Sequence, residues 1–196
     1  MRKTSSENST GSLRIIGGQW RSRKLQFPLL DGLRPTGDRL RETLFNWLAP
    51  EIAGAHCLDL FAGSGALGLE ALSRGAADCV FVEKDRRAAE AIRQHLGTLK
   101  AEGGVVVNAE VGAWLEQADR RFDVVFLDPP FASDSYAPVL RALAERRLLA
   151  DGGKLYLEFD RRRAPAVPAA FEVLRDKSAG QTGYQLLAFA LSDLSR

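Results

Sequence analysis

Two short phrases carry residues whose types and spacing could do chemistry: LDLFAGSG at 58–65 and DPPF at 128–131, each closing an apolar run. The first offers bare glycine backbone, which a ligand can approach closely. The second offers hydrogen-bond acceptors in a rigid frame, because consecutive prolines fix φ at about −65° and lack N–H donors. A loop that can hold a cofactor, next to oxygens that can accept hydrogen bonds from an amine, predicts transfer of a group from the cofactor to that amine. A methyl group fits this arrangement best.

The glycine loop fits two cofactors. Gly63, Gly65 and Gly68 spell GxGxxG, and Glu83 follows Gly63 by 20 residues, which is also the fingerprint of dinucleotide binding. Asp59 favours S-adenosylmethionine, because a carboxylate before the loop repels a pyrophosphate and attracts an ammonium or sulfonium group. The structural alternative is a buried Asp59 that accepts hydrogen bonds from loop amides.

Other positions extend these two sites. Asn108, or the backbone amide of Ala109, is expected near the amino edge of an adenine. At the second phrase, the Asp128 carboxylate and the Pro129 carbonyl can accept the hydrogens of an exocyclic base amine and so localise its lone pair. Phe131 can stack on the base. The alternative for DPPF is an Asp-Pro turn packed by a phenylalanine.

The rest of the chain predicts the elements that position both phrases. From His56 onward, runs rich in Val, Leu and Phe alternate with helical stretches, which is typical of an α/β protein with a mainly parallel sheet covered on both faces. Ligands bind such sheets at the carboxyl ends of the strands, where both phrases lie. Predicted strands are 57–61, 78–83, 104–108, 122–127, 154–159, 171–177 and 184–191, and predicted helices are 65–74, 86–99, 110–118 and 136–147.

Residues 13–50 form a basic extension in this prediction. Leu13–Ile16 and Gln19–Phe27, joined by Gly17-Gly18, predict a β-hairpin that exposes Trp20 among basic residues, and Thr36 or Asp38 can cap a following helix. Residues 1–50 hold nine Lys or Arg and four acids, a net charge of +5, while the whole chain has +2. A basic arm is expected to meet a polyanion such as RNA, although a solvated segment has the same composition.

Composition argues against several other classes. With 45% hydrophobic and 27% charged residues and no apolar run near the roughly 18 residues of a membrane span, we expect a cytoplasmic protein with no membrane partner. Residues 1–12 are expected to be a disordered tail or a cloning remnant. Cys57 and Cys79 lie in apolar runs without metal-ligand spacing, so we expect buried thiols and no metal site.

Five segments in this order resemble one family: RIIGGQWRSRKL, GLRPTGDRLRETLFNWL, CLDLFAGSGALGLEALSRGA, FDVVFLDPPF and AGQTGYQL. They are similar to the RsmD-type bacterial methyltransferases of 16S ribosomal RNA, which act on the N2 amine of a guanine. The resemblance covers about residues 13–191. It implies a class I S-adenosylmethionine-dependent methyltransferase domain at 51–196, with a Rossmann-like, seven-stranded, mostly parallel sheet and an N-terminal hairpin extension. The implied substrate is RNA in an assembling small subunit, and we expect a monomer.

Together with the resemblance, these arguments assign site residues. The expected cofactor residues are Asp59, Phe61, Ala62, Gly63, Ser64, Gly65, Glu83, Asn108 and Ala109. The expected catalytic residues are Asp128, Pro129, Pro130 and Phe131, and the expected RNA-binding residues are Arg14, Trp20, Arg21, Arg23, Lys24, Arg34 and Arg41. Gly37 stands where the family has a second Thr, so a hydroxyl role there is not expected.

For two regions the sequence leaves more than one structural role open. Arg161–Arg163 is typical of a solvated loop, with an RNA contact as the alternative, and Tyr184 fits either core packing or the substrate side. Rival functions are methylation of DNA adenine or of a protein glutamine, an NAD-dependent oxidoreductase, and an RNA-binding factor without activity. Transfer of a labelled methyl group distinguishes DNA and protein substrates from RNA. Calorimetry with NADH tests the oxidoreductase, and the intact Asp128 disfavours an RNA-binding factor without activity.

Overall fold

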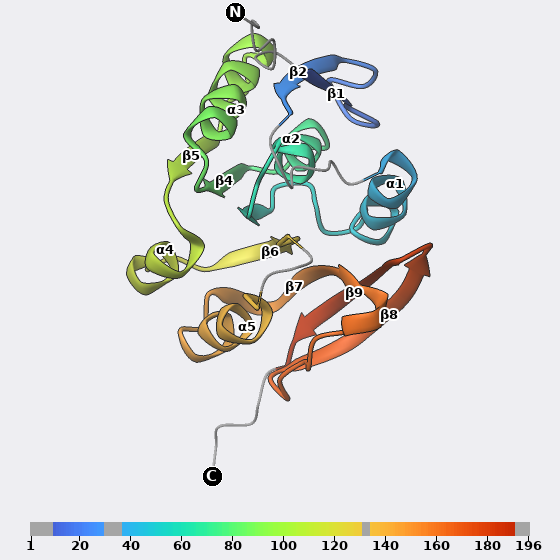
Figure 1. Ribbon diagram of the computed structural model, residues 1–196, viewed down its shortest axis with the longest axis vertical. Coiled ribbons are helices and arrows are strands. Elements are labelled where there is room, and N and C mark those ends of the chain that lie inside the picture. Colours follow the sequence, from blue (N-terminus) through green and yellow to red (C-terminus); the bar gives the residue numbers. More distant parts are fainter. Residues whose placement is uncertain (1–9, 30–36, 131–133, 191–196) are drawn as a thin grey trace, which may run out of the picture.

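A seven-stranded sheet forms the centre of the protein (Figure 1), as predicted. The computed structural model describes residues 10–29, 37–130 and 134–190. The strands lie in the order β5-β4-β3-β6-β7-β9-β8, and β9 runs antiparallel to both of its neighbours. They are β3 (His56–Leu60), β4 (Asp78–Glu83), β5 (Gly104–Asn108), β6 (Phe122–Leu127), β7 (Leu149–Asp160), β8 (Phe171–Ala179) and β9 (Thr182–Phe189).

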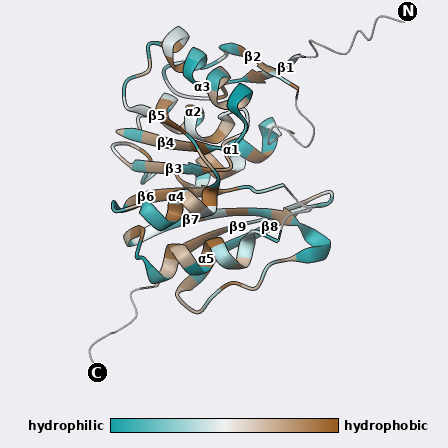
Figure 2. Cartoon of the chain, turned by 60° about the vertical axis from the view of Figure 1, so that its left-hand side comes forward, coloured by the Kyte–Doolittle hydropathy of each residue, from teal (hydrophilic) through white to brown (hydrophobic). Residues whose placement is uncertain are grey.

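Helices cover the two faces of the sheet because alternate strand residues point to opposite sides. On β3, Cys57 packs toward the face covered by the first three helices, whereas Leu58 packs toward the face covered by the last two. Figure 2 shows hydrophobic residues along β4 and β6, in the middle of the molecule. The helices are α1 (Asp38–Trp47), α2 (Ala66–Ser73), α3 (Arg86–Leu99), α4 (Val111–Gln117) and α5 (Tyr136–Glu145).

The N-terminal hairpin differs in register from the prediction. Its strands are β1 (Thr10–Arg14) and β2 (Lys24–Pro28), with Arg14 opposite Lys24, so Gly17-Gly18 is not a two-residue turn. The connecting residues instead turn toward α2 and donate hydrogen bonds to its side chains. Side chains of α2, outside the hairpin, therefore determine the conformation of the connecting loop. Such long-range contacts cannot be predicted from the periodicity of the strands.

Strand ends differ by a few residues elsewhere. β7 begins at Leu149, five residues before the predicted start, because Leu149 pairs with Phe122 before a register shift. β3 ends at Leu60, one residue early, because the next residue takes a left-handed conformation. Within the described ranges, no helix has both the length and the apolar character to cross a membrane.

Candidate active site

Three neighbouring strands bring acidic residues to one edge of the sheet. Leu60 of β3 lies opposite Leu127 of β6 on one side and opposite Val82 of β4 on the other. The residues that follow these three positions therefore begin at the same level. The glycine loop after β3 consequently lies between Glu83 and Asp128. The segments 58–65 and 128–131 are therefore neighbours, as predicted from the sequence.

The glycine loop has a strained backbone. Phe61 has φ 60°, and Gly63 and Gly65 have φ 55° and 78°, so three residues of this short turn are left-handed. Glycine adopts this conformation freely, whereas for Phe61 it costs on the order of 1–3 kcal/mol. Ala62 and Ser64 complete the loop and are both buried. Such strain is concentrated at functional sites, which fits a loop shaped for a ligand.

The third glycine of the motif lets α2 approach the sheet. A methyl group on Gly68 would lie 2.2 Å from a ring carbon of Phe81 and 2.7 Å from the Cys79 sulfur, both on β4. A side chain at this position would therefore push the helix away from the strand. The closely packed helix holds the preceding loop against the sheet edge.

Glu83 ties the glycine loop to the next connection. It is 8% exposed, and its two carboxylate oxygens accept hydrogen bonds from Gly63 N and Asp85 N, each at 2.7 Å. Each oxygen of an ionised carboxylate has a second lone pair, so Glu83 retains acceptor capacity for the two hydroxyls of a ribose.

Asp59 is buried beneath the same loop and accepts a hydrogen bond from Gly68 N at 2.9 Å. This contact is the loop-amide role that the sequence left open. Burial raises the pKa of Asp59 well above its usual range; the Gly68 bond opposes this shift, and the nearby carboxylates of Asp128 and Glu83 add to it. A cationic ligand at this edge would relieve the repulsion among the three acids.

The groups expected near an adenine are engaged within the protein. The Asn108 side-chain nitrogen donates to the carbonyls of Glu83 and Lys84, both at 2.9 Å, and the Ala109 amide donates to the Glu83 carbonyl at 3.2 Å. Asn108 and Ala109 therefore hold the connection that carries Glu83. The Ala109 amide is thus engaged with the Glu83 carbonyl, and a contact of either residue with adenine stays a prediction.

The DPP loop continues directly from β6. Asp128 is half-buried, Pro129 is buried and Pro130 is exposed, so this segment passes from the core to the surface within three residues. Phe131, expected to stack on the base, lies outside the described residues. The placement of Asp128 beside the glycine loop is the geometry that attack of a bound amine on a cofactor requires.

The acidic and phenolic groups beside Asp128 were not predicted from the sequence. Glu158 is buried on β7, the next strand of the sheet, and accepts a hydrogen bond from the Tyr156 hydroxyl at 3.0 Å. The Tyr136 hydroxyl donates to the Glu158 backbone carbonyl at 3.1 Å. Burial raises the pKa of Tyr136 and of Tyr156, and Asp128 contributes to both shifts. An acid that closes the apolar run of a neighbouring strand was the available signal for Glu158.

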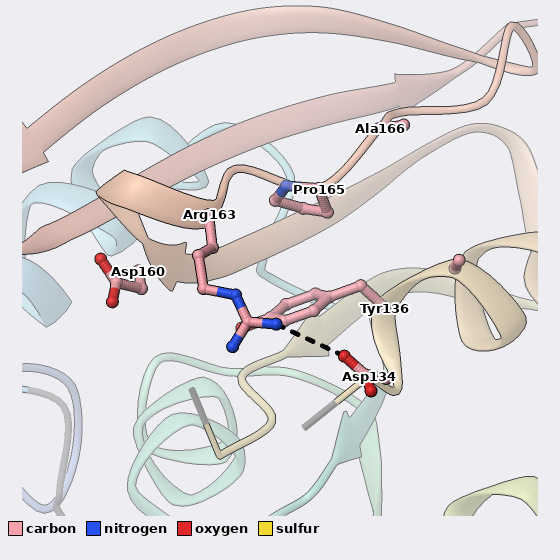
Figure 3. A pocket seen from close by; sticks show the side chains of 7 residues that line it. Asp134, Tyr136, Asp160, Arg163, Pro165 and Ala166 are labelled. Atoms are coloured by element: carbon pink, nitrogen blue, oxygen red, sulfur yellow. Dashed lines mark ion pairs between the residues drawn. The ribbon is translucent and has the colours of Figure 1, made fainter. Parts of the chain in front are cut away.

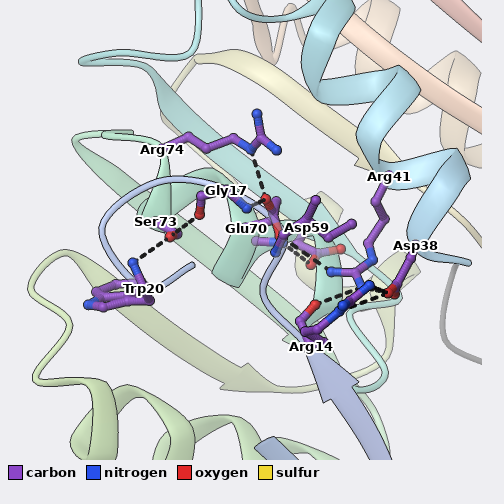
Figure 4. Close-up of polar contacts among 11 residues, drawn as sticks. Arg14, Gly17, Trp20, Asp38, Arg41, Asp59, Glu70, Ser73 and Arg74 are labelled. Carbon is purple, nitrogen blue, oxygen red and sulfur yellow. Dashed lines mark hydrogen bonds and ion pairs between the residues drawn. The ribbon is translucent and has the colours of Figure 1, made fainter. Parts of the chain in front are cut away.

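Glu70 anchors the N-terminal loop to α2 (Figure 4). This carboxylate is fully buried and accepts hydrogen bonds from Ile16 N and Gly17 N, both at 2.8 Å. Two guanidinium groups supply its countercharge, Arg74 at 2.8 Å and Arg41 at 3.4 Å. Because α2 begins at the glycine loop, the anchor fixes the N-terminal loop relative to the glycine loop.

The structure corrects the expected role of Arg41. Its side chain is 1% exposed, pairs with Asp38 at 2.7 Å and donates to the Arg14 carbonyl at 2.8 Å. It is therefore enclosed by its own protein and unavailable to an RNA phosphate. Arg14 is exposed and pairs with the other oxygen of Asp38, also at 2.7 Å.

The remaining basic residues of the extension are on the surface. Arg21, Arg23 and Lys24 are all exposed, as expected for an RNA contact. Trp20 was predicted to be exposed, but it is half-buried and packs against the hydrophobic core. Arg34 lies outside the described residues. Tyr184 is buried and stacks on Trp47 with ring centroids 5.6 Å apart, in agreement with core packing.

Burial of the two cysteines is confirmed, and they lie opposite each other on β3 and β4 as free thiols. Burial raises the pKa of both thiols. Among the described residues, no group of three or more His, Cys, Asp or Glu is arranged to hold a metal ion.

Comparisons with known proteins agree with this geometry. Residues 13–188 match the model of a family described as conserved hypothetical protein 95. The chain is 48% identical over 185 residues to ribosomal RNA small subunit methyltransferase D of Escherichia coli, covering 94% of this chain and 93% of the relative. It is 42% identical over 190 residues to the protein of the same name from Haemophilus influenzae, covering 95% and 98%.

A solved Escherichia coli structure described as a methyltransferase superposes with a TM-score of 0.83 at 48% identity. The match covers 91% of this chain and 98% of that chain. The fold is therefore that of a methyltransferase, as the family resemblance implied.

Proposed function

From the premise that the chain belongs to the RsmD family of ribosomal RNA methyltransferases, described as conserved hypothetical protein 95, we propose a specific reaction. The chain methylates the exocyclic N2 amine of a guanine in 16S ribosomal RNA, with S-adenosylmethionine as the methyl donor. Its substrate is the assembling small ribosomal subunit in the cytoplasm. The observation that carries this proposal is the position of Asp128 at the same sheet edge as the glycine loop and Glu83.

The residues at this edge fit S-adenosylmethionine on physical grounds. Asp59, Glu83 and Asp128 form an acidic group: burial raises the pKa of Asp59, and the carboxylates of Asp128 and Glu83 raise it further. An ammonium and a sulfonium would be attracted to such a site, whereas the pyrophosphate of a dinucleotide would be repelled. Glu83 retains lone pairs for ribose hydroxyls, and the loop 61–65 presents backbone to the ligand. When bound, S-adenosylmethionine supplies a methyl group that a nucleophile can attack.

The protein's part in the reaction is to prepare the amine. The lone pair of guanine N2 is delocalised into the ring, so the amine is a weak nucleophile. Asp128 accepts one of its hydrogens, which draws the lone pair out of the ring and toward the methyl group. Bound S-adenosylmethionine would supply the methyl group, and the methylated nitrogen would then carry a surplus proton that Asp128 takes directly or through water.

Pro129 and Pro130 hold these acceptors in place. Their φ angles are fixed and they offer no competing N–H donor, so the loop meets the amine with carbonyl and carboxylate oxygens. Rigid acceptors shorten the search for an aligned attack geometry.

The exposed cations of the N-terminal loop (residues 15–23), together with Lys24, the first residue of β2, contact the RNA. Arg21, Arg23 and Lys24 are presented by a segment that Glu70 fixes to α2. Phosphate contacts from such residues set the orientation of the nucleic acid and make its binding depend on salt. The loop thereby orients the RNA relative to Asp128.

Transfer of a labelled methyl group tests the proposal directly. Small-subunit particles from a strain lacking this enzyme should accept the label at one guanine, whereas DNA and release factor should accept none. Mass spectrometry of the digested RNA should identify N2-methylguanosine. An unchanged methylguanosine content in the deletion strain, or label on DNA or release factor in place of RNA, would refute the assignment.

A further inference from the structure

A second basic surface lies at the catalytic edge, where β7 ends. Three consecutive exposed arginines form the single-turn helix η1 (Arg161–Arg163). We propose that this turn binds RNA phosphates next to the target nucleotide and complements the N-terminal loop. The inference rests on the proposed function and adds a second RNA contact to it.

Strand register places the turn beyond Asp128. β6 and β7 are parallel neighbours, and Leu127 lies opposite Leu157, so Asp128 and Glu158 follow at the same level. Arg161 comes three residues after Glu158, which is about 10 Å of extended chain at roughly 3.3 Å per residue. The turn therefore stands outside the catalytic carboxylate, on the same edge of the sheet.

Hydrogen bonds preorganise this turn. The Asp160 carboxylate accepts a hydrogen bond from Arg162 N at 2.9 Å, and Arg161 N donates to the Gln181 carbonyl at 2.8 Å in the turn between β8 and β9. The guanidinium of Arg163 lies 3.6 Å from the Asp134 carboxylate, and both side chains line a pocket of about 240 Å³ together with Tyr136 and Pro165 (Figure 3). A turn held at these points loses little conformational freedom when an anion binds.

Two of the three arginines in the turn, Arg161 and Arg162, are exposed and differ from Arg163 in their ion pairing. The nearby acids Asp160 and Asp134 are engaged by Arg162 N and by the Arg163 side chain. In the described part of the chain, the Arg161 and Arg162 guanidiniums pair with no carboxylate. By contrast Arg120 and Arg121, at the opposite end of β6, pair with Asp78 and Asp151. Two guanidiniums that pair with none of the described carboxylates suit phosphate at the catalytic edge, because Arg binds phosphate with two parallel hydrogen bonds.

Salt dependence of RNA binding tests the surface. Co-sedimentation with unmethylated small-subunit particles at 50–200 mM KCl would measure the binding of the wild type, of Arg161→Ala/Arg162→Ala, of Arg161→Lys/Arg162→Lys, and of the control Arg120→Ala/Arg121→Ala. Each lost contact to a single strand lowers the slope of log affinity against log salt by about 0.7. The double alanine variant should therefore give a slope shallower by about 1.4. Its affinity relative to that of the wild type should accordingly rise about 7-fold as the salt concentration increases over this range. The lysine pair and the control should keep the wild-type slope.

Two results would overturn the inference: an unchanged slope in Arg161→Ala/Arg162→Ala, or an equal reduction in the control, which would indicate a general charge effect. Thermal melts establish that each variant is folded. Methyl transfer by the wild type to small-subunit particles separates this inference from the proposed function. Transfer with an unchanged slope removes only the η1 contact, whereas absence of transfer to RNA removes the proposed function itself.

Discussion

Two buried glutamates on this chain make the same kind of backbone contact in opposite electrostatic surroundings. Glu70 and Glu83 each accept hydrogen bonds from two main-chain amides. Glu70 also pairs with Arg41 and Arg74, so the protein supplies its countercharge. Glu83 lies near Asp59, whose pKa it helps to raise, and within the described ranges neither of these two acids pairs with a Lys or Arg.

This difference separates an anchor from a ligand site. A carboxylate balanced by arginines holds two parts of the chain together and needs nothing from outside. Carboxylates that repel one another destabilise the ligand-free protein, and a cationic ligand lowers this repulsion when it binds. We therefore expect substitutions at Glu70 to affect stability and substitutions at the sheet edge to affect binding or turnover.

The largest effect is expected for Asp128→Ala. Loss of the acceptor for the amine should lower kcat by about 10²–10⁴-fold, the range for general base catalysis. Cofactor affinity should change by less than the tenfold that corresponds to about 1.4 kcal/mol. Single-turnover methyl transfer and calorimetry measure the two quantities. Asp123→Ala, at the other end of β6, is the matched control; cofactor binding lost together with turnover would place Asp128 among the cofactor contacts.

Glu70→Gln should mainly destabilise the fold. Removing the charge leaves the guanidinium of Arg41 buried with less compensation, and breaking a buried pair costs about 3–5 kcal/mol. Urea unfolding measures this loss, with the exposed Glu102→Gln as a control of the same chemistry. A loss no larger than that of the control would show that the arginines do not depend on Glu70.

Glu83→Gln should mainly weaken the cofactor. Hydrogen bonds to a charged group contribute about 1.5–3 kcal/mol, so the dissociation constant for S-adenosylmethionine should rise about 10–100-fold. Calorimetry gives this constant, and urea unfolding should show a smaller loss of stability than Glu70→Gln. Unaltered affinity would mean that Glu83 only shapes the loop.

A smaller effect concerns pH. Because the folded-state pKa of Asp59 is raised above 3.8, the folded state binds its proton more tightly than the unfolded state. The contribution of Asp59 is therefore fully present below pH 3.8 and is lost as the pH rises through the folded-state pKa. The difference in unfolding free energy between the wild type and Asp59→Asn, measured across pH, should fall over this window. Parallel curves would contradict the raised pKa.

Much of the fold and the edge of the site could be predicted because they depend on local patterns. Runs of Val, Leu and Phe gave the strands, and the spacing from Gly63 to Glu83 placed both at the carboxyl ends of neighbouring strands. The juxtaposition with Asp128 followed from strand ends that meet at one edge of a parallel sheet.

Contacts between distant segments could not be predicted in this way. Glu70 looks like an ordinary helix acid in the sequence, and only its burial against Ile16 and Gly17 shows that it is an anchor. For the same reason Arg41 was expected on the surface, although Glu70 and Asp38 enclose it. Hydrogen bonds from Asn108 and Ala109 to the end of β4 likewise depend on tertiary geometry.

Urea unfolding with and without S-adenosylmethionine tests the central contrast most directly, on the wild type, Glu70→Gln and Glu83→Gln. At a ligand concentration of about 100 times the wild-type dissociation constant, the wild type should gain about 2.7 kcal/mol. Glu70→Gln should keep this gain on a lowered baseline, whereas Glu83→Gln should lose about half of it or more, on a baseline closer to wild type. The reverse pattern, with the ligand gain lost in Glu70→Gln and kept in Glu83→Gln, would contradict the account.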